Sequence, residues 1–273
     1  MSADLSRARS LLEEAESSGL DLSHVPANTA KLRLLLDLRG LIPEDGALSV
    51  LDVGCGGKFK PFELWTTLAP FADRLRLAGV DVAYLEPVER RAREVGLLIE
   101  LTPASALRLV ETLGRDRFDV VVSTQVLEHI RDWPGALRQM RDVLRPGGTL
   151  LMTCDSGDLE RPGHERVRLV GKRAYARVVE AVPAVGRAGR RVFSGDWELG
   201  PGREDVRSVC ESLGLEVERL AWYGLTDSKT AQNRAGTGTR LASLVLEETI
   251  DAELAGAAPA ELYRLLYLRA RKP

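Results

Sequence analysis

The stretch VLDVGCGGK at residues 50–58 places an acidic side chain and three glycines at the end of an apolar run. Gly54, Gly56 and Gly57 allow backbone angles that a Cβ forbids, and they let the chain approach a bulky ligand closely. In an open parallel sheet, the loop after the first strand is the usual place for such a ligand. Asp52 lies just before the first glycine, and a carboxylate there suits a cationic ligand better than a phosphate.

The residues that follow exclude two common nucleotide-binding loops. A dinucleotide fingerprint needs a small third residue in GxGxxG or GxGxxA, and Phe59 stands at that position. A P-loop needs Ser or Thr directly after its lysine, and Lys58 is followed by neither. Taken alone, the glycines fit a tight strand-to-helix turn equally well, so other motifs must decide between a turn and a ligand site.

The elements around this loop follow the pattern of a buried parallel sheet. From Leu48 onward, short apolar runs alternate with amphipathic stretches of helix length. The apolar runs predict strands at 49–53, 76–82, 97–101, 119–123 and 149–154. The stretches between them predict helices near 61–72, 87–95, 104–113 and 134–144. Right-handed crossovers would join these elements into a doubly wound α/β sheet.

Further elements are predicted on both sides of this core. Two amphipathic helices precede it, one at 4–18 and one that begins after Asn28, a good N-cap, and ends near Gly40. Residues 156–205 break the rhythm and read as an insertion over the carboxyl edge of the sheet. A helix at 202–213, the strand-like LEVERLAWYGL, a helix near 239–255 and a last strand in LYRLLYLRARK follow.

Composition and charge limit the function classes. The 273 residues carry a formal net charge of −2, which argues against bulk affinity for nucleic acid. The three cysteines and three histidines lack zinc-ligand spacing, which predicts no metal site and fits a reducing compartment. The charged N-terminus and the absence of an apolar run of about 18 residues predict a cytoplasmic protein with no membrane partner.

Three separated motifs decide the question that the glycines left open. They are VLDVGCGG at 50–57, LAGVDV at 77–82, and FDVVVSTQVLEHI at 118–130 followed by MRDVLRPGGTLLMTC at 140–154. With these motifs in this order, the chain resembles the class I S-adenosylmethionine-dependent methyltransferases, in particular the small-molecule branch. The resemblance spans about residues 48–155 and the final strands. It implies a Rossmann-like sheet of seven mostly parallel strands, with the last strand antiparallel.

The resemblance also implies S-adenosylmethionine as the cofactor and S-adenosylhomocysteine as its product. Asp81 would accept hydrogen bonds from both ribose hydroxyls, and Val82 would pack beside the adenine. The Asp52 carboxylate would help to hold the methionine ammonium group. The residues that would line the methionine portion are Asp52, Gly54, Cys55 and Gly56.

The adenine side departs from the family pattern. Thr102, Pro103 and Ala104 stand where the family often carries an acid that accepts the adenine amino group. We therefore expect the Ala104 backbone to recognise the adenine, with either Thr102 or Ser105 as polar help. Thr124 and Gln125 would emerge from the fourth strand opposite the glycine loop, and Gln125 would reach the cofactor or the acceptor.

The chemistry needs alignment more than activation, because the sulfonium methyl group is already reactive. A hydroxyl or amine acceptor also needs a base, and the imidazole pKa suits proton transfer near neutrality. His129 follows the fourth strand, and His164 lies in the insertion where an acceptor would enter. Asp155, just past the fifth strand, is a weaker candidate. A purely structural histidine explains either position as well.

We therefore expect a methyltransferase domain at 45–273, with the N-terminal helices 1–44 and the insertion 156–205 forming an acceptor lid. The expected acceptor is a small molecule that is methylated on oxygen. Nine Lys or Arg against three acids between residues 160 and 191 favour an anionic acceptor, although a solvated basic surface explains them equally well. A catalytically silent S-adenosylmethionine-binding module and an aminopropyltransferase stay open as alternatives. The sequence predicts no oligomeric state.

Overall fold

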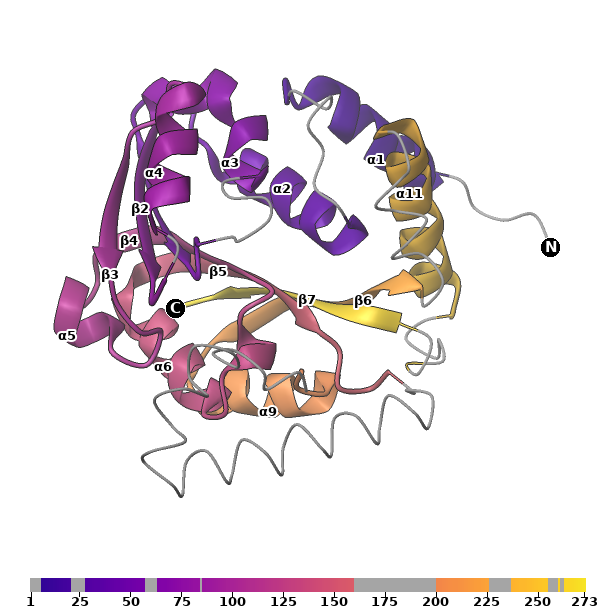
Figure 1. Ribbon diagram of the computed structural model, residues 1–273. Coiled ribbons are helices and arrows are strands. Elements are labelled where there is room, and N and C mark those ends of the chain that lie inside the picture. Colours follow the sequence, from indigo (N-terminus) through magenta and orange to yellow (C-terminus); the bar gives the residue numbers. More distant parts are fainter. Residues whose placement is uncertain are drawn as a thin grey trace.

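A single mixed sheet forms the centre of the computed structural model (Figure 1). The structure describes residues 6–20, 28–56, 63–83, 85–159, 200–225, 237–254, 260 and 263–273. Within these residues, seven strands pair in the order β3-β2-β1-β4-β5-β7-β6. Their bounds are β1 Leu48–Val53, β2 Leu75–Asp81, β3 Ile99–Pro103, β4 Phe118–Thr124, β5 Leu144–Asp155, β6 Glu216–Leu225 and β7 Tyr263–Arg271.

The strand directions confirm the predicted doubly wound sheet. The pairs β1–β2, β1–β4, β2–β3 and β4–β5 are parallel, whereas β7 is antiparallel to both β5 and β6. The chain moves outward from β1 to β3 and then returns to β4 on the other side of β1. The winding therefore reverses between the carboxyl ends of β1 and β4, where Val53 lies beside Ser123 and where sheets of this kind bind ligands.

Helices cover both faces of the sheet (Figure 1). Apolar side chains of α2, α3 and α4 belong to the core on one face, and those of α5, α6 and α9 to the core on the other. Because β1 contributes Val50 to the first core and Leu51 to the second, it reads as a continuous apolar run. The helices are α1 Ser6–Ser17, α2 Thr29–Leu41, α3 Glu63–Thr67, α4 Leu85–Glu94, α5 Leu109–Leu113, α6 Trp133–Val143, α9 Arg203–Ser212 and α11 Thr237–Leu254, with 3₁₀ helices η2 Ala69–Arg74 and η3 Leu127–His129.

Local sequence signals explain several helix ends. The Asn28 side chain accepts a hydrogen bond from the Lys31 backbone N–H at 2.8 Å, which confirms it as the N-cap of α2. Asp132 caps α6 in the same way through the backbone N–H of Gly135 at 3.0 Å. Gly19 follows α1 with a φ of +69°, a conformation that glycine adopts without strain.

The predicted helix at 104–113 is wrong over its first half, because only Leu109–Leu113 is helical. The Ala104 backbone N–H donates to the Asp81 carbonyl at 3.1 Å and so continues the strand pairing. The Ser105 hydroxyl then accepts from the Leu107 backbone N–H at 3.2 Å, a local turn that competes with helix formation. The short α5 leaves part of the β2–β3 face uncovered by a helix.

The prediction of one helix at 61–72 is also wrong over residues 63–72, which the structure describes. This segment is divided into α3 and the 3₁₀ helix η2, which begins at Ala69. Pro70 stands in the first turn of η2, and its missing N–H and its ring prevent an α-helix from continuing through this position. Strand β3 begins at Ile99, two residues later than predicted.

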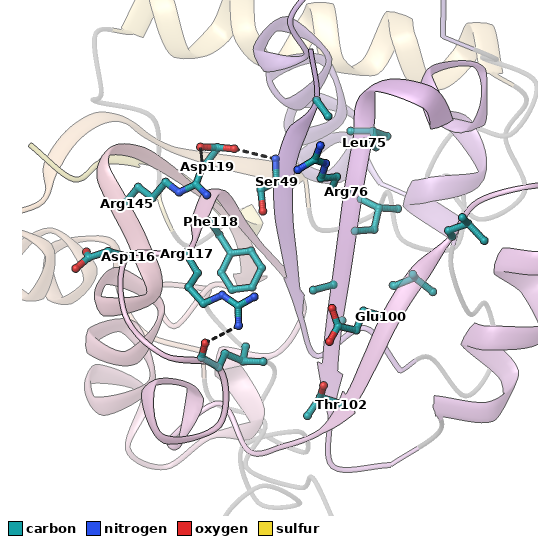
Figure 2. A pocket seen from close by; sticks show the side chains of 17 residues that line it. Ser49, Leu75, Arg76, Glu100, Thr102, Asp116, Arg117, Phe118, Asp119 and Arg145 are labelled. Atoms are coloured by element: carbon teal, nitrogen blue, oxygen red, sulfur yellow. Dashed lines mark hydrogen bonds and ion pairs between the residues drawn. The ribbon is translucent and has the colours of Figure 1, made fainter.

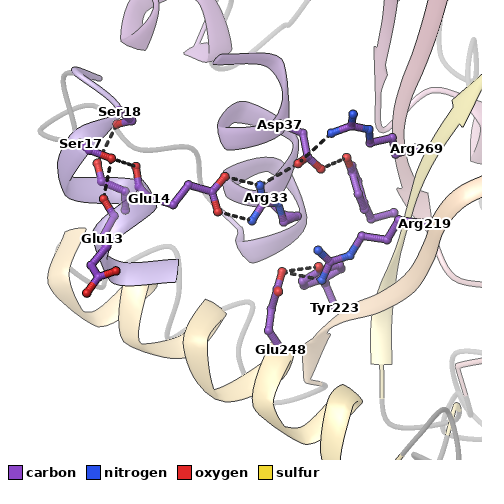
Figure 3. Close-up of polar contacts among 12 residues, drawn as sticks. Glu13, Glu14, Ser17, Ser18, Arg33, Asp37, Arg219, Tyr223, Glu248 and Arg269 are labelled. Atoms are coloured by element: carbon purple, nitrogen blue, oxygen red, sulfur yellow. Dashed lines mark hydrogen bonds and ion pairs between the residues drawn. The ribbon is translucent and has the colours of Figure 1, made fainter. Parts of the chain in front are cut away.

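Helices α1, α2 and α11 are fixed to the sheet by buried ion pairs (Figure 3). Arg33 of α2 donates to Glu14 of α1 at 2.6 Å and to Asp37 at 2.7 Å. Asp37 also accepts from the Tyr267 hydroxyl and from Arg269 of β7. We call these five residues, together with Arg219, Tyr223 and Glu248, the cap network.

The other half of the cap network attaches α11 to β6. Glu248 of α11 accepts from Arg219 and from the Tyr223 hydroxyl of β6, both at 2.7 Å. The neighbouring Glu247 accepts from the Thr29 hydroxyl at 2.6 Å and from the Gly224 backbone N–H at 3.0 Å. Since Gly224 lies near the carboxyl end of β6, these bonds hold the first turn of α2 at the carboxyl edge of the sheet.

Candidate active site

The glycine loop after β1 is packed too closely to accept side chains. Gly54 has a φ of +79°, and a Cβ there would lie 2.2 Å from Cγ2 of Val126, which follows β4. A Cβ on Gly56 would lie 2.4 Å from the Ala83 carbonyl oxygen, in the loop after β2. The glycines therefore bring the loops after β1, β2 and β4 together at the switch point. Gly57 lies outside the described residues.

Asp81 joins two of these loops at the carboxyl end of β2. One carboxylate oxygen accepts from the Gly56 backbone N–H and the other from the Ala83 backbone N–H, each at 2.9 Å. Burial raises the pKa of Asp81, although these backbone donors oppose the shift. Both oxygens are thus held in place before any ligand is bound. The Val82 side chain beside them is 78% exposed, an unusual position for a large apolar group.

The adenine-side residues are brought to the same edge. Thr102 and Pro103 end β3, and Asp81 pairs with Pro103 in the register of β2 and β3. The Ala104 backbone N–H is used by the Asp81 carbonyl oxygen. A contact between the Ala104 backbone and a ligand would therefore involve its carbonyl group rather than its N–H.

Asp52 lies in β1 just before the glycine turn, and Cys55 lies within the turn between Gly54 and Gly56. Asp52 is 8% exposed, and its carboxylate accepts from the Trp65 indole N–H at 2.7 Å. Burial raises the pKa of Asp52 to about 6, while the Trp65 hydrogen bond and the charge of Lys31 lower it. Burial also raises the pKa of the Cys55 thiol, so Cys55 is a neutral packing group and not a nucleophile.

The end of β4 contains a strained residue. Gln125 has a φ of 59°, in the left-handed region that residues with a Cβ seldom adopt. Its backbone N–H donates to the Thr153 carbonyl at 2.8 Å, so pairing with β5 holds the strained conformation. Its side-chain Nε2 is buried and has no hydrogen-bond partner. Strain of this kind is typical of ligand sites. Thr124, the last residue of β4, is half-buried beside it.

Glu128, three residues after Gln125, is a buried carboxylate that the sequence analysis did not single out. Glu128 in η3 is 3% exposed, and its Oε2 has no hydrogen-bond partner. Burial and the charge of Asp155 raise the pKa of Glu128 to about 8, although backbone N–H groups of Glu128 and Asp155 and the charge of Lys31 oppose this. Asp155 Oδ1, at the end of β5, is likewise buried and unpartnered. Lys31 thus acts on both Asp52 and Glu128.

Of the two predicted catalytic histidines, the structure describes only His129. The His129 side chain is exposed, and its backbone N–H donates to the Val126 carbonyl within η3. His164 lies outside the described residues. Catalysis by either histidine stays a prediction. The motif VLEHI drew attention to His129 because imidazole titrates near neutrality, whereas burial gives the preceding Glu128 a pKa in the same range.

A cavity of about 720 Å³ lies elsewhere, along the β1–β3 face toward the amino ends of the strands (Figure 2). Arg76, Glu100 and Arg117 line it, and Asp119 there binds Arg145 at 2.8 Å and the Ser49 backbone N–H at 2.9 Å. It shares only Thr102 with the predicted cofactor residues. The cavity lies where the short α5 leaves this face of the sheet uncovered.

The described residues contain neither a cluster suited to a metal ion nor a helix suited to a membrane span. No group of three or more His, Cys, Asp or Glu in this part of the chain is placed to hold a metal ion. No helix in the same residues is long and apolar enough to cross a membrane.

Comparison with known proteins agrees with this geometry. Residues 23–180 match the family model described as a methyltransferase domain. A ubiquinone biosynthesis O-methyltransferase of Cereibacter sphaeroides is 32% identical over 127 residues, 44% of this chain and 45% of that protein. One of Methylobacterium nodulans is 29% identical over 179 residues, 63% of this chain and 61% of that protein. The chain therefore spans less than two thirds of the length of either curated relative.

Solved structures share the fold at low identity. The [4+2]-cyclase SpnF has a TM-score of 0.54 at 19% identity and covers 88% of this chain and 80% of its own. Phosphoethanolamine N-methyltransferase 2 of Haemonchus contortus, solved with S-adenosyl-L-methionine, has a TM-score of 0.53 at 16% identity over 88% of this chain and 52% of its own. Because the family match covers more than half of the residues, the chain belongs to the methyltransferase-domain family of class I S-adenosylmethionine-dependent methyltransferases.

Proposed function

We propose that this protein transfers the methyl group of S-adenosylmethionine to an oxygen atom of a small-molecule acceptor. The observation that carries the proposal is the pre-arranged Asp81 carboxylate beside the glycine turn at the switch point. The curated relatives named O-methyltransferases support oxygen as the accepting atom.

The residues at this edge fit the proposed cofactor. Each carboxylate oxygen of Asp81 accepts one backbone N–H and retains capacity for one ribose hydroxyl, since an ionised carboxylate offers about four acceptor sites. The exposed Val82 provides an apolar surface for the adenine. Asp52 would hold the methionine ammonium group, and the Ala104 carbonyl would accept from the adenine amino group. When bound, the cofactor supplies a methyl carbon on a positively charged sulfur.

The charge of the edge agrees with that assignment. Asp52, Asp81 and Asp155, together with Glu128 once it ionises, give the carboxyl ends of β1, β2, β4 and β5 an excess of negative charge, with Lys31 as a counter-charge. A cationic ligand reduces the cost of keeping these carboxylates ionised, because an opposite charge nearby favours the charged form. The protein's further task is to align the acceptor and to exclude water.

We further propose that α1 and α2, together with residues 156–205, cover the acceptor. The hydrogen bond from the Thr29 hydroxyl to Glu247 at 2.6 Å holds the first turn of α2 near the carboxyl edge of the sheet, which supports this proposal. The basic segment that favours an anionic acceptor lies within 160–191, outside the described residues. The described residues at the edge are mainly acidic, so we assign a neutral hydroxyl as the group that is methylated.

Methyl transfer is tested by incubating the protein with methyl-labelled S-adenosylmethionine and fractions of a small-molecule extract. We expect labelled product in an organic-soluble fraction, with its label lost when the product is treated with reagents that cleave methyl ethers. Binding of the cofactor without transfer to any fraction would instead favour a silent binding module. This test is needed because the [4+2]-cyclase SpnF shares the fold, so the fold alone does not establish methyl transfer.

A further inference from the structure

Glu128 differs from the other buried carboxylates that the structure describes. Asp142, Glu247 and Glu248 each accept hydrogen bonds from side chains or backbone groups of other elements. Glu128 Oε2 has no such partner, although the side chain is buried. An unpartnered oxygen on a buried carboxylate is costly, and it is retained where a ligand completes the bonding.

The surroundings of Glu128 point to that ligand. Asp155 of β5 acts on it with a like charge and has its own unpartnered oxygen, and the thiol of the neighbouring Cys154, on which both charges act, is buried and neutral. Lys31 of α2 contributes the positive charge and also acts on Asp52 at the methionine end. Gln125 adds an unpartnered buried amide nitrogen. Two acceptor oxygens and one donor therefore lie at the carboxyl ends of β4 and β5, next to the switch point.

We propose that Glu128, held by Asp155, accepts the proton of the acceptor hydroxyl group during methyl transfer. This inference rests on the function proposed above. The O–H bond of the acceptor breaks and its proton passes to Glu128. The acceptor oxygen forms the bond to the methyl carbon, and the electron pair of the broken carbon–sulfur bond stays on the sulfur as a neutral thioether.

The same geometry explains how Glu128 becomes ready for this step. Burial and Asp155 raise the pKa of Glu128 to about 8, so the free protein holds it largely protonated near neutrality. A cation bound beside it favours the carboxylate and expels the proton. A base with a pKa near the working pH is efficient. Asp155 acts through Glu128 as a positioning residue.

The test measures protons released on ligand binding, which needs no acceptor. Calorimetric titrations of the full chain with S-adenosylmethionine and with S-adenosylhomocysteine are run at pH 7.5 in two buffers of different ionisation enthalpy. For a group of pKa about 8, about three quarters of a proton is available for release. We expect release approaching that value with the cationic ligand and much less with the neutral thioether.

Substitutions of single residues identify the side chain that releases the proton. Glu128→Gln should abolish the release while it leaves the affinity for S-adenosylhomocysteine within about twofold, because the sulfur of that ligand carries no charge for Glu128 to oppose. Glu111→Gln, on an exposed carboxylate that pairs with Arg108, should release protons as the wild type does. If Glu128→Gln does not fold, Asp155→Asn serves instead: without the like charge the pKa of Glu128 falls, and the release at pH 7.5 shrinks.

The outcomes separate this inference from the proposed function. Equal proton release with both ligands, or full release by Glu128→Gln, overturns the role of Glu128 and leaves the cofactor site intact. Failure of the folded wild-type chain to bind either ligand overturns the proposed function, and this inference falls with it.

Discussion

Two clusters of buried ionisable side chains lie in this molecule, and they are built in opposite ways. In the cap network, Arg33 lies between Glu14 and Asp37, and Glu248 lies between Arg219 and Tyr223, so positive and negative groups alternate (Figure 3). At the carboxyl edge, Glu128 faces another carboxylate and keeps an unpartnered oxygen.

The comparison distinguishes paired buried charges, which hold elements of the fold together, from unpaired buried carboxylates, which a ligand would complete. Balanced ion pairs add little net stability compared with apolar packing, but they fix which surfaces dock, here α1, α2 and α11 on β6 and β7. An unbalanced carboxylate pair lowers stability in the free protein. Such perturbed groups in a cleft are typical of sites where a ligand supplies the missing charge.

The largest expected effect comes from breaking the balanced cluster. Arg33→Met would leave Asp37, only 11% exposed, beside the Tyr267 hydroxyl without its main counter-charge. Removing one partner of a buried ion pair costs about 3 to 5 kcal/mol. Urea unfolding should show this loss, whereas the matched change Arg93→Met, on a surface pair with Glu89, should change stability little. Equal midpoints for the two variants would refute the structural role of the cap network.

Removing charge from the unbalanced cluster should have the opposite sign. Burial raises the pKa of Glu128 from 4.5 to about 8, so the native state binds the proton more tightly than the unfolded state. Stability conferred by this group is present below pH 4.5 and is lost as pH rises through about 8. Glu128→Gln should therefore be more stable than wild type at pH 8.5, by roughly 2 to 4 kcal/mol, and similar at pH 4.5.

Unfolding curves at several pH values check this second prediction. Asp52, whose pKa burial raises to about 6, adds a smaller loss of the same sign between pH 3.8 and 6 in both proteins. A Glu128→Gln variant that is less stable than wild type at pH 8.5 would show that the carboxylate is balanced after all.

Asp81 is intermediate between the two clusters in its bonding, because two backbone N–H groups satisfy part of the capacity of its carboxylate. Asp81→Ala should weaken cofactor binding by about 1 to 3 kcal/mol through lost charge-assisted hydrogen bonds. Isothermal titration with S-adenosylhomocysteine measures the change, and Glu100→Ala on the neighbouring strand β3 is the control, because Glu100 is exposed there. An unchanged Kd in Asp81→Ala would remove the ribose contact from the account.

The smallest effect is expected away from both clusters. Gly40 in α2 has open space around the position of a Cβ, so Gly40→Ala should stabilise the protein by about 0.5 to 1 kcal/mol. Gly214 also has open space but a φ of +70°, so the same substitution there should destabilise. Thermal unfolding of the pair checks this, and equal shifts would show that backbone conformation does not decide these positions.

Short-range patterns predicted most of the fold and the part of the candidate site that contains the glycine loop and Asp81. Apolar runs located the strands, Asn28 marked the start of α2, and the glycine loop and Asp81 stood out because each belongs to a short sequence motif. The predicted helix at 104–113 failed because Ala104 bonds to the Asp81 backbone from a different strand, a contact that no local pattern contains.

Long-range contacts explain what the sequence did not predict. Asp37 and Tyr267 are 230 positions apart, so nothing near either residue indicates that Asp37 is buried and paired. Glu128 looks like an ordinary polar residue in VLEHI until β5 brings Asp155 against it. The motif drew attention to this segment, and our proposal rests on Glu128 within it because the tertiary structure buries that carboxylate.

A crystal structure with S-adenosylhomocysteine tests the central claim most directly. The account predicts ribose hydroxyls on the Asp81 carboxylate and a sulfur atom that faces the side of the pocket formed by Glu128 and Asp155. Ribose bound away from Asp81, or a ligand seated in the cavity lined by Arg76 and Arg117, would contradict it.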